Sequence, residues 1–202
     1  PNMPGGFQWL SMAVIMKARV EMLWDSGAAC NSVPEEWVVY MINEAHARGI
    51  KPGSEEYPIV QFDRWPKSEV VNGLEATKPI PLVGGVILRV SLLEGQDVST
   101  ATVGPEIWVS CKVLGKGCSG FKGLIMGGRA MSHPAEGGLG IRDTPKGYAC
   151  DKLNITLPAM EPSADARKGR GEFVYPVYVM TTEVLGTFDS VSAYTANPKE
   201  PE

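Results

Sequence analysis

The residues most able to do chemistry in this sequence stand together at Asp25-Ser26-Gly27. Apolar residues precede this triplet and Ala28 follows it, which indicates a strand that runs directly into a tight turn. A carboxyl group held at such a turn can take a proton from water or give one to a substrate. The triplet alone is a weak signal, because average residue usage places Asp-Ser/Thr-Gly in roughly one chain in ten of this length. Its meaning depends on the elements that position it.

A second segment strengthens the signal. Leu124-Ile125-Met126-Gly127 is a short apolar strand that ends in glycine, about a hundred residues after Asp25. Together the two segments resemble the retropepsin family of aspartic proteases, the one-lobed enzymes of retroviruses and retrotransposons. In that family the Asp-Ser/Thr-Gly loop lies beside the downstream apolar strand. The stretch 22–33 is similar to the cellular and retrotransposon branch, and in particular to the retropepsin-like domains in retrotransposon polyproteins of dinoflagellate algae.

The resemblance implies an aspartic endopeptidase in which two carboxyl groups share one proton, because two carboxylates about 3 Å apart cannot both ionise. This chain supplies a single Asp-Ser/Thr-Gly triplet, since Asp189-Ser190 is followed by Val191 and too little chain remains for a second lobe. A bilobed monomer is therefore excluded. We expect two copies of Asp25 to meet across the two-fold axis of a homodimer that acts on a polypeptide substrate.

Other roles follow from the same resemblance. Ser26 is expected to brace the loop across the dimer, and Gly27 and Ala28 to let the substrate backbone approach closely. The flap that closes over substrate is expected between residues 71 and 85, with Asn72, Gly73 and Leu74 binding substrate, since Asn-Gly favours a tight turn. An ordinary surface hairpin is the alternative for this segment. No cofactor is expected.

Two positions depart from the family pattern. Ala29 stands where viral members commonly have an acidic residue, and Gly127 is followed by Gly128-Arg129-Ala130 rather than by a polar residue and then Asp or Asn. The usual ion-pair partners are therefore absent or displaced. The departures bear on how the dimer is locked and how the substrate backbone is anchored, and leave the pair of carboxyl groups itself unaffected.

Composition and charge narrow the classes of function that this protein could have. The formal charge is −4 and the pI is about 5.3, so we expect no nucleic-acid partner. Four cysteines and two histidines lack the paired spacing of a zinc site, and we expect no metal.

Reduced thiols and the lack of a signal peptide or long apolar run indicate an intracellular protein. Because the sequence starts at Pro1, we expect a polyprotein fragment or a processed product. The main alternative function is a catalytically silent subunit or binding module within a larger assembly, for example an organellar one.

The fold class expected is mostly β: a single-lobed acid-protease barrel with one inserted helix and a β-rich C-terminal extension. Apolar runs and apolar–polar alternation predict strands near residues 7–14, 18–24, 57–62, 86–92, 107–113, 123–128, 153–157 and 173–181. A capping box at Ser32 and Glu35 and a terminal Gly49 predict the helix. We expect a retropepsin-like domain over residues 1–160, with its core at about 10–132. Residues 161–202 form an extension of unknown role.

Overall fold

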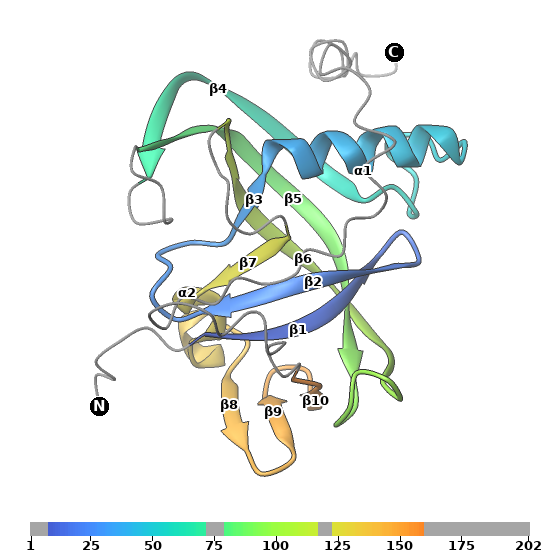
Figure 1. Cartoon of the computed structure of the whole chain (residues 1–202), viewed down its shortest axis with the longest axis vertical. Coiled ribbons are helices and arrows are strands. Elements are labelled where there is room, and N and C mark those ends of the chain that lie inside the picture. Colours follow the sequence, from blue (N-terminus) through green and yellow to red (C-terminus); the bar gives the residue numbers. More distant parts are fainter. Residues whose placement is uncertain (1–7, 72–78, 117–122, 160–202) are drawn as a thin grey trace, which may run out of the picture.

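A computed structural model describes residues 8–71, 79–116 and 123–159 of the chain (Figure 1). Strands dominate, as predicted. The elements are β1 (Gln8–Ile15), β2 (Ala18–Asp25), β3 (Ser32–Pro34), α1 (Glu35–Ala47), β4 (Ile59–Val71), β5 (Ile80–Glu94), β6 (Thr102–Leu114), β7 (Leu124–Gly127), α2 (Gly128–Met131), the 3-10 turn η1 (Pro134–Glu136), β8 (Ile141–Thr144), β9 (Gly147–Cys150) and β10 (Ile155–Leu157). Within the described ranges, no helix combines the length and apolar character needed to cross a bilayer.

The first two strands form a hairpin. β1 and β2 pair antiparallel from Gln8 opposite Asp25 to Ile15 opposite Ala18. The turn between them consists of Met16 and Lys17, both of which have positive φ angles, 50° and 63°. Two residues in this conformation match the right-handed twist of the flanking strands. The hairpin confirms the two strands predicted before Asp25 and delivers that residue to one end of the sheet.

Seven strands form one sheet in the order β1-β2-β7-β3-β6-β5-β4. The sheet curves until β1 also pairs with β5, at Ala13 opposite Leu92 and Val14 opposite Ser91. The pairing therefore runs from β1 through β2, β7, β3, β6 and β5 and back to β1, and β4 lies beyond β5. The return contact spans only two residue pairs; the mostly β character is confirmed, and the single-lobed barrel stays a prediction.

Helix α1 follows β3 and packs through one apolar face. Its buried residues include the predicted stripe of Val38, Met41, Ile42 and Ala45. Gly49 ends the helix with φ 71°. The amide of Gly49 donates to the carbonyl of His46, and that of Ile50 donates to the carbonyl of Ala45, both over 2.9 Å. This is the Schellman arrangement, in which a left-handed glycine satisfies the last carbonyls of a helix.

The predicted capping box at the start of α1 is wrong. The helix begins at Glu35 with Pro34 as its N-cap, and no side chain caps it. Ser32 is 5% exposed and belongs to β3, where it pairs with Lys112 of β6 and with Ile125 of β7. Strand pairing on both sides fixes the backbone of Ser32 in an extended form, so tertiary contacts override the local capping signal.

A second, three-stranded sheet has the order β10-β9-β8. Its strands β8 and β9 were not predicted, and β10 is the C-terminal part of the strand expected at 153–157. This sheet shares the main core: Cys150 and Leu157 are buried with Trp24 and Leu88 of the large sheet and Met41 of α1. The strand expected at 173–181 and the extension at 161–202 lie outside the described residues.

Candidate active site

Asp25 is the last residue of β2, and its position is set by a parallel strand from far along the chain. β2 and β7 pair in parallel with Trp24 opposite Met126 and Asp25 opposite Gly127. The structure therefore brings together the two segments that the sequence analysis singled out. Figure 1 shows them side by side at the same end of the sheet, where β2 ends and β7 passes into α2.

The loop after Asp25 turns back at once. The amide of Gly27 donates to Oδ1 of Asp25 over 2.8 Å, and the amide of Ala28 donates to the Asp25 carbonyl over 3.1 Å. These bonds hold the carboxyl group in a fixed relation to its own loop. Asp25 is half-buried, whereas Ser26 and Gly27 are exposed. The arrangement holds a half-buried carboxyl group beside two exposed loop residues.

Gly127 and Gly128 allow the loop to lie directly on β7. A Cβ atom added to Gly127 would come within 2.8 Å of the carbonyl oxygens of Ala28 and Cys30, and one on Gly128 within 2.7 Å of the Ser26 carbonyl oxygen. Real Cβ atoms do not approach backbone so closely. The amide of Gly128 donates to the Ala28 carbonyl over 2.9 Å. Both positions therefore require glycine so that the loop can sit where it does.

The apolar residues before Gly127 anchor β7 on both faces. Leu124 and Met126 lie in the main core, while Ile125 packs with Leu10 and Leu23 in a small cluster on the other face. Ala28 contacts this small cluster, so one end of the loop is also fixed by apolar packing. All four residues of β7 are buried. Close packing therefore holds rigid the strand that pairs with β2 at Asp25.

Sequence reasoning missed Asn31, the last loop residue before β3. Its Oδ1 accepts from the amide of Gly127 over 2.9 Å, and its Nδ2 donates to the carbonyl of Ser110 over 3.1 Å. Its own carbonyl accepts from the amide of Lys112 over 2.9 Å. No local pattern could reveal this role, because the partners of the side chain lie 96 and 79 positions away.

For the other residues that the sequence analysis singled out, the structure gives less detail. Asn72, Gly73 and Leu74, expected in the flap, lie outside the described residues. Ala29 and Arg129 are both exposed. Within the described part of the chain, no group of three or more His, Cys, Asp or Glu side chains is arranged to hold a metal ion.

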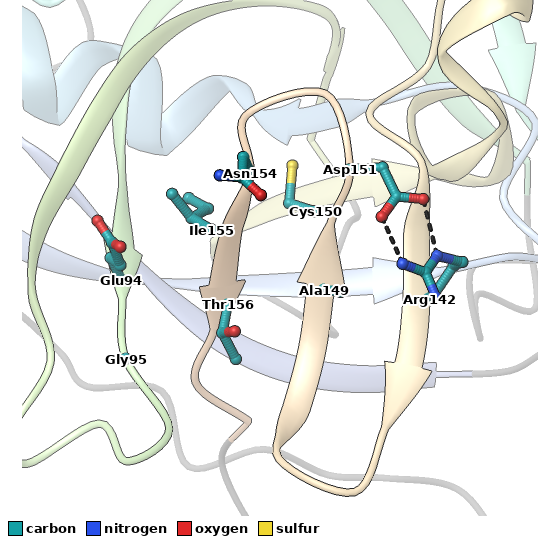
Figure 2. A pocket seen from close by; sticks show the side chains of 9 residues that line it. All are labelled: Glu94, Gly95, Arg142, Ala149, Cys150, Asp151, Asn154, Ile155 and Thr156. Atoms are coloured by element: carbon teal, nitrogen blue, oxygen red, sulfur yellow. Dashed lines mark hydrogen bonds and ion pairs between the residues drawn. The ribbon is translucent and has the colours of Figure 1, made fainter.

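Two cavities lie away from Asp25. One, of about 370 Å³, sits beside the second sheet (Figure 2). Two of its charged side chains pair with each other, since Arg142 binds both carboxylate oxygens of Asp151 over 2.6 and 2.7 Å, and Glu94 lies apart from them in the lining (Figure 2). The other, of about 630 Å³, lies at the opposite end of the β1–β2 hairpin, where its walls include Met16, Arg19, Ile50 and Arg89. Neither is lined by Asp25 or its loop.

Comparison with known proteins adds a structural likeness. No protein-family model matches the sequence, and no curated protein matches it. Among solved structures, the chain is similar to the crystal structure of the retroviral protease-like domain of Ddi1 from Leishmania major, with a TM-score of 0.42 and 14% sequence identity. That match covers 78% of this chain and 97% of the Leishmania chain.

Proposed function

We propose that this protein is an aspartic endopeptidase whose active site forms when two copies of Asp25 meet in a homodimer. The observation that carries the proposal is the junction of β2 and β7, where Asp25 lies opposite Gly127 and its carboxyl group accepts from the Gly27 amide over 2.8 Å. A carboxyl group held in this way at an accessible loop fits acid–base chemistry. Because the chain has one Asp-Ser/Thr-Gly triplet, a second copy has to supply the other carboxyl group.

The proposed reaction uses one proton shared between the two carboxyl groups. The ionised group takes a proton from water, and the water oxygen attacks the peptide carbonyl carbon. The protonated group gives its proton to the carbonyl oxygen. The resulting diol then collapses: its C–N bond breaks, the leaving nitrogen receives the proton taken from water, and a diol hydroxyl returns a proton to the other carboxylate. The pair ends with one proton, as it began.

The loop residues have supporting roles in this proposal. Ser26 and Gly27 are exposed beside the carboxyl group; in this proposal Ser26 bonds across the dimer and Gly27 leaves room for the substrate backbone. Ala28, which is partly buried against Ile125, borders the substrate groove. A segment between 71 and 85 would close over the substrate as a flap.

The deciding experiment compares the wild-type dimer with Asp25→Asn on a broad peptide library between pH 3 and 7. We expect cleavage under acid conditions, inhibition by a statine-type transition-state mimic, and complete loss of cleavage in Asp25→Asn with the fold intact. Asp63→Asn, at an exposed carboxylate of β4, is the matched control and should retain activity. A wild-type dimer that cleaves no library member at any of these pH values would contradict the proposal.

The second candidate is a catalytically silent subunit of a larger assembly. It is favoured by Ala29 and Gly128, which stand at two positions where the family pattern has an acidic or polar residue. Sedimentation of the purified chain separates the two candidates. A chain that stays monomeric at micromolar concentration, and that cleaves nothing, fits the silent subunit.

A further inference from the structure

Asn31 occupies the point at which strand β3 begins between β7 and β6. β3 pairs with β7 at a single position, Ser32 opposite Ile125, and with β6 from Ser32 to Pro34. Toward the Asp25 loop, the Asn31 backbone keeps one hydrogen bond to β6, from the Lys112 amide to the Asn31 carbonyl, and the Asn31 side chain makes the bond to β7. Its amide group spans the gap by accepting from β7 and donating to β6.

The β7 end of this bridge lies directly opposite Asp25. Oδ1 of Asn31 accepts from the amide of Gly127, and Gly127 is the residue paired with Asp25 in the parallel ladder. The β6 end is held twice, by the Asn31 side chain to the Ser110 carbonyl and by the Lys112 amide to the Asn31 carbonyl. Any shift of Asn31 is therefore transmitted to the backbone beside the carboxyl group.

Other contacts between the loop and β7 include a backbone hydrogen bond and the apolar packing of Ala28 beside Ile125. The amide of Gly128 donates a hydrogen bond to the carbonyl of Ala28. Gly127 and Gly128 themselves have no side chains that could contact the loop. The Asn31 amide adds a side-chain hydrogen bond that joins this loop to β7. A primary amide suits the task because it supplies one acceptor and one donor at the same time.

We propose that Asn31 is a positioning residue for catalysis, which holds the Asp25 loop at the spacing that the carboxyl pair needs. This inference rests on the proposed function and names a residue that the function alone does not require. Asn31 does not touch the reacting atoms. It acts through Gly127, so its loss should lower the rate of the chemical step more than it weakens substrate binding.

Two substitutions separate the parts of the bridge. Asn31→Ala removes both side-chain bonds, whereas Asn31→Asp keeps an acceptor for Gly127 and loses the donor to Ser110. Because a displacement of about 1 Å can cost roughly 100-fold in rate, we expect kcat to fall by about 10- to 100-fold in Asn31→Ala, with KM within about threefold of wild type. Asn31→Asp should recover part of the lost kcat.

A matched control tests whether lost stability alone explains the effect. Asn154 lies in the turn before β10 with φ 54°, a conformation that alanine adopts at a cost. Asn154→Ala should lower the free energy of unfolding without lowering kcat. If Asn154→Ala lowers kcat as much as Asn31→Ala at equal loss of stability, the positioning role is overturned.

Amide hydrogen exchange gives a readout that does not need activity. In Asn31→Ala the Gly127 amide should exchange at least about tenfold faster than in wild type, because it loses its acceptor, and Asn31→Asp should keep it protected. An unchanged exchange rate at Gly127 in folded Asn31→Ala overturns the inference. A further outcome is that the Gly127 amide exchanges faster in Asn31→Ala while the wild-type protein cleaves no peptide. That result would support the bridge between the loop and β7 and would refute the proposed protease activity.

Discussion

The indole nitrogen of Trp24 donates a hydrogen bond to the hydroxyl of Ser11 over 2.8 Å in the buried interior. Trp24 immediately precedes Asp25, and its ring stacks on Trp9 with centroids 5.1 Å apart. Trp9 stacks in turn on Tyr148 of the second sheet, with centroids 3.6 Å apart. The residue next to the candidate catalytic carboxyl is thus fixed by one polar contact and a row of three aromatic rings.

Removal of the Ser11 hydroxyl should destabilise the protein. Ser11→Ala leaves the Trp24 N–H buried without an acceptor, which costs about 1–3 kcal/mol. Chemical denaturation of the variant and of wild type measures this difference. Ser110→Ala is the control, since the Ser110 side chain is exposed, and it should change stability by less than about 0.5 kcal/mol. Equal stability of Ser11→Ala and wild type would contradict the assignment.

Alanine at Gly127 should also be costly. Its Cβ would press on two loop carbonyl oxygens 2.8 Å away, so the loop or β7 has to move, at about 1–3 kcal/mol. Gly85 is a matched control on β5, because a Cβ there would meet nothing closer than 3.8 Å. Thermal melts of both variants should show a lower Tm for Gly127→Ala alone. A similar Tm for the two would show that the loop adapts freely.

Glu21 should make stability depend on pH. Its side chain is 8% exposed, and burial raises the pKa of its carboxyl from 4.5 to about 7, because desolvation disfavours the charged form. Between these values the folded state binds more protons than the unfolded state. Stability therefore falls as pH rises from about 4.5 to about 7 and stays lower above pH 7.

Glu21→Gln removes this dependence. The variant should exceed wild type in stability by about 1–2 kcal/mol at pH 8, and the two should converge near pH 4.5. Urea denaturation at both pH values measures the difference. Glu55→Gln, at an exposed loop position, serves as the control and should leave the pH dependence of wild type unchanged. A Glu21→Gln variant that is less stable than wild type at pH 8 would refute this account.

The cysteines should differ in reactivity. Cys30 is partly exposed in the Asp25 loop, whereas Cys111 and Cys150 are buried. Burial raises the pKa of the Cys111 thiol, and the nearby Cys30 raises it further. Since the thiolate is the reactive form, iodoacetamide at pH 8 should modify Cys30 in the folded protein and reach Cys111 and Cys150 only after unfolding. Peptide mapping by mass spectrometry reads out each site, and modification of Cys111 in the native state would contradict its burial.

The sequence was informative where the residues of one element carry the signal. The two strands before Asp25 alternate in a way that the hairpin confirms, and the stripe from Val38 to Ala45 is the buried face of α1. Gly127 was identified because an apolar run that ends in glycine is visible locally. These features depend on neighbours within a few residues, which is why pattern alone predicted them.

Features that depend on distant partners escaped prediction. Ser32 is a residue type that often caps helices, yet its pairing with strands about 80 and 90 residues later makes it part of β3. Strands β8 and β9 have four residues each, with mixed polarity, and are defined by each other. The role of Asn31 depends on two backbone groups from separate strands. In each case long-range contacts, rather than local preference, decide the outcome.

The parallel pairing of β2 with β7 also has a kinetic consequence. About a hundred residues separate Asp25 from Gly127, and contacts of such long sequence separation are slow to form because a large loop has to close first. During synthesis, a ribosome that has released β2 still has to make most of the curved sheet before β7 emerges. The nascent chain thus carries Asp25 without its final setting until late, and the proposed active site can form only when the large sheet is complete.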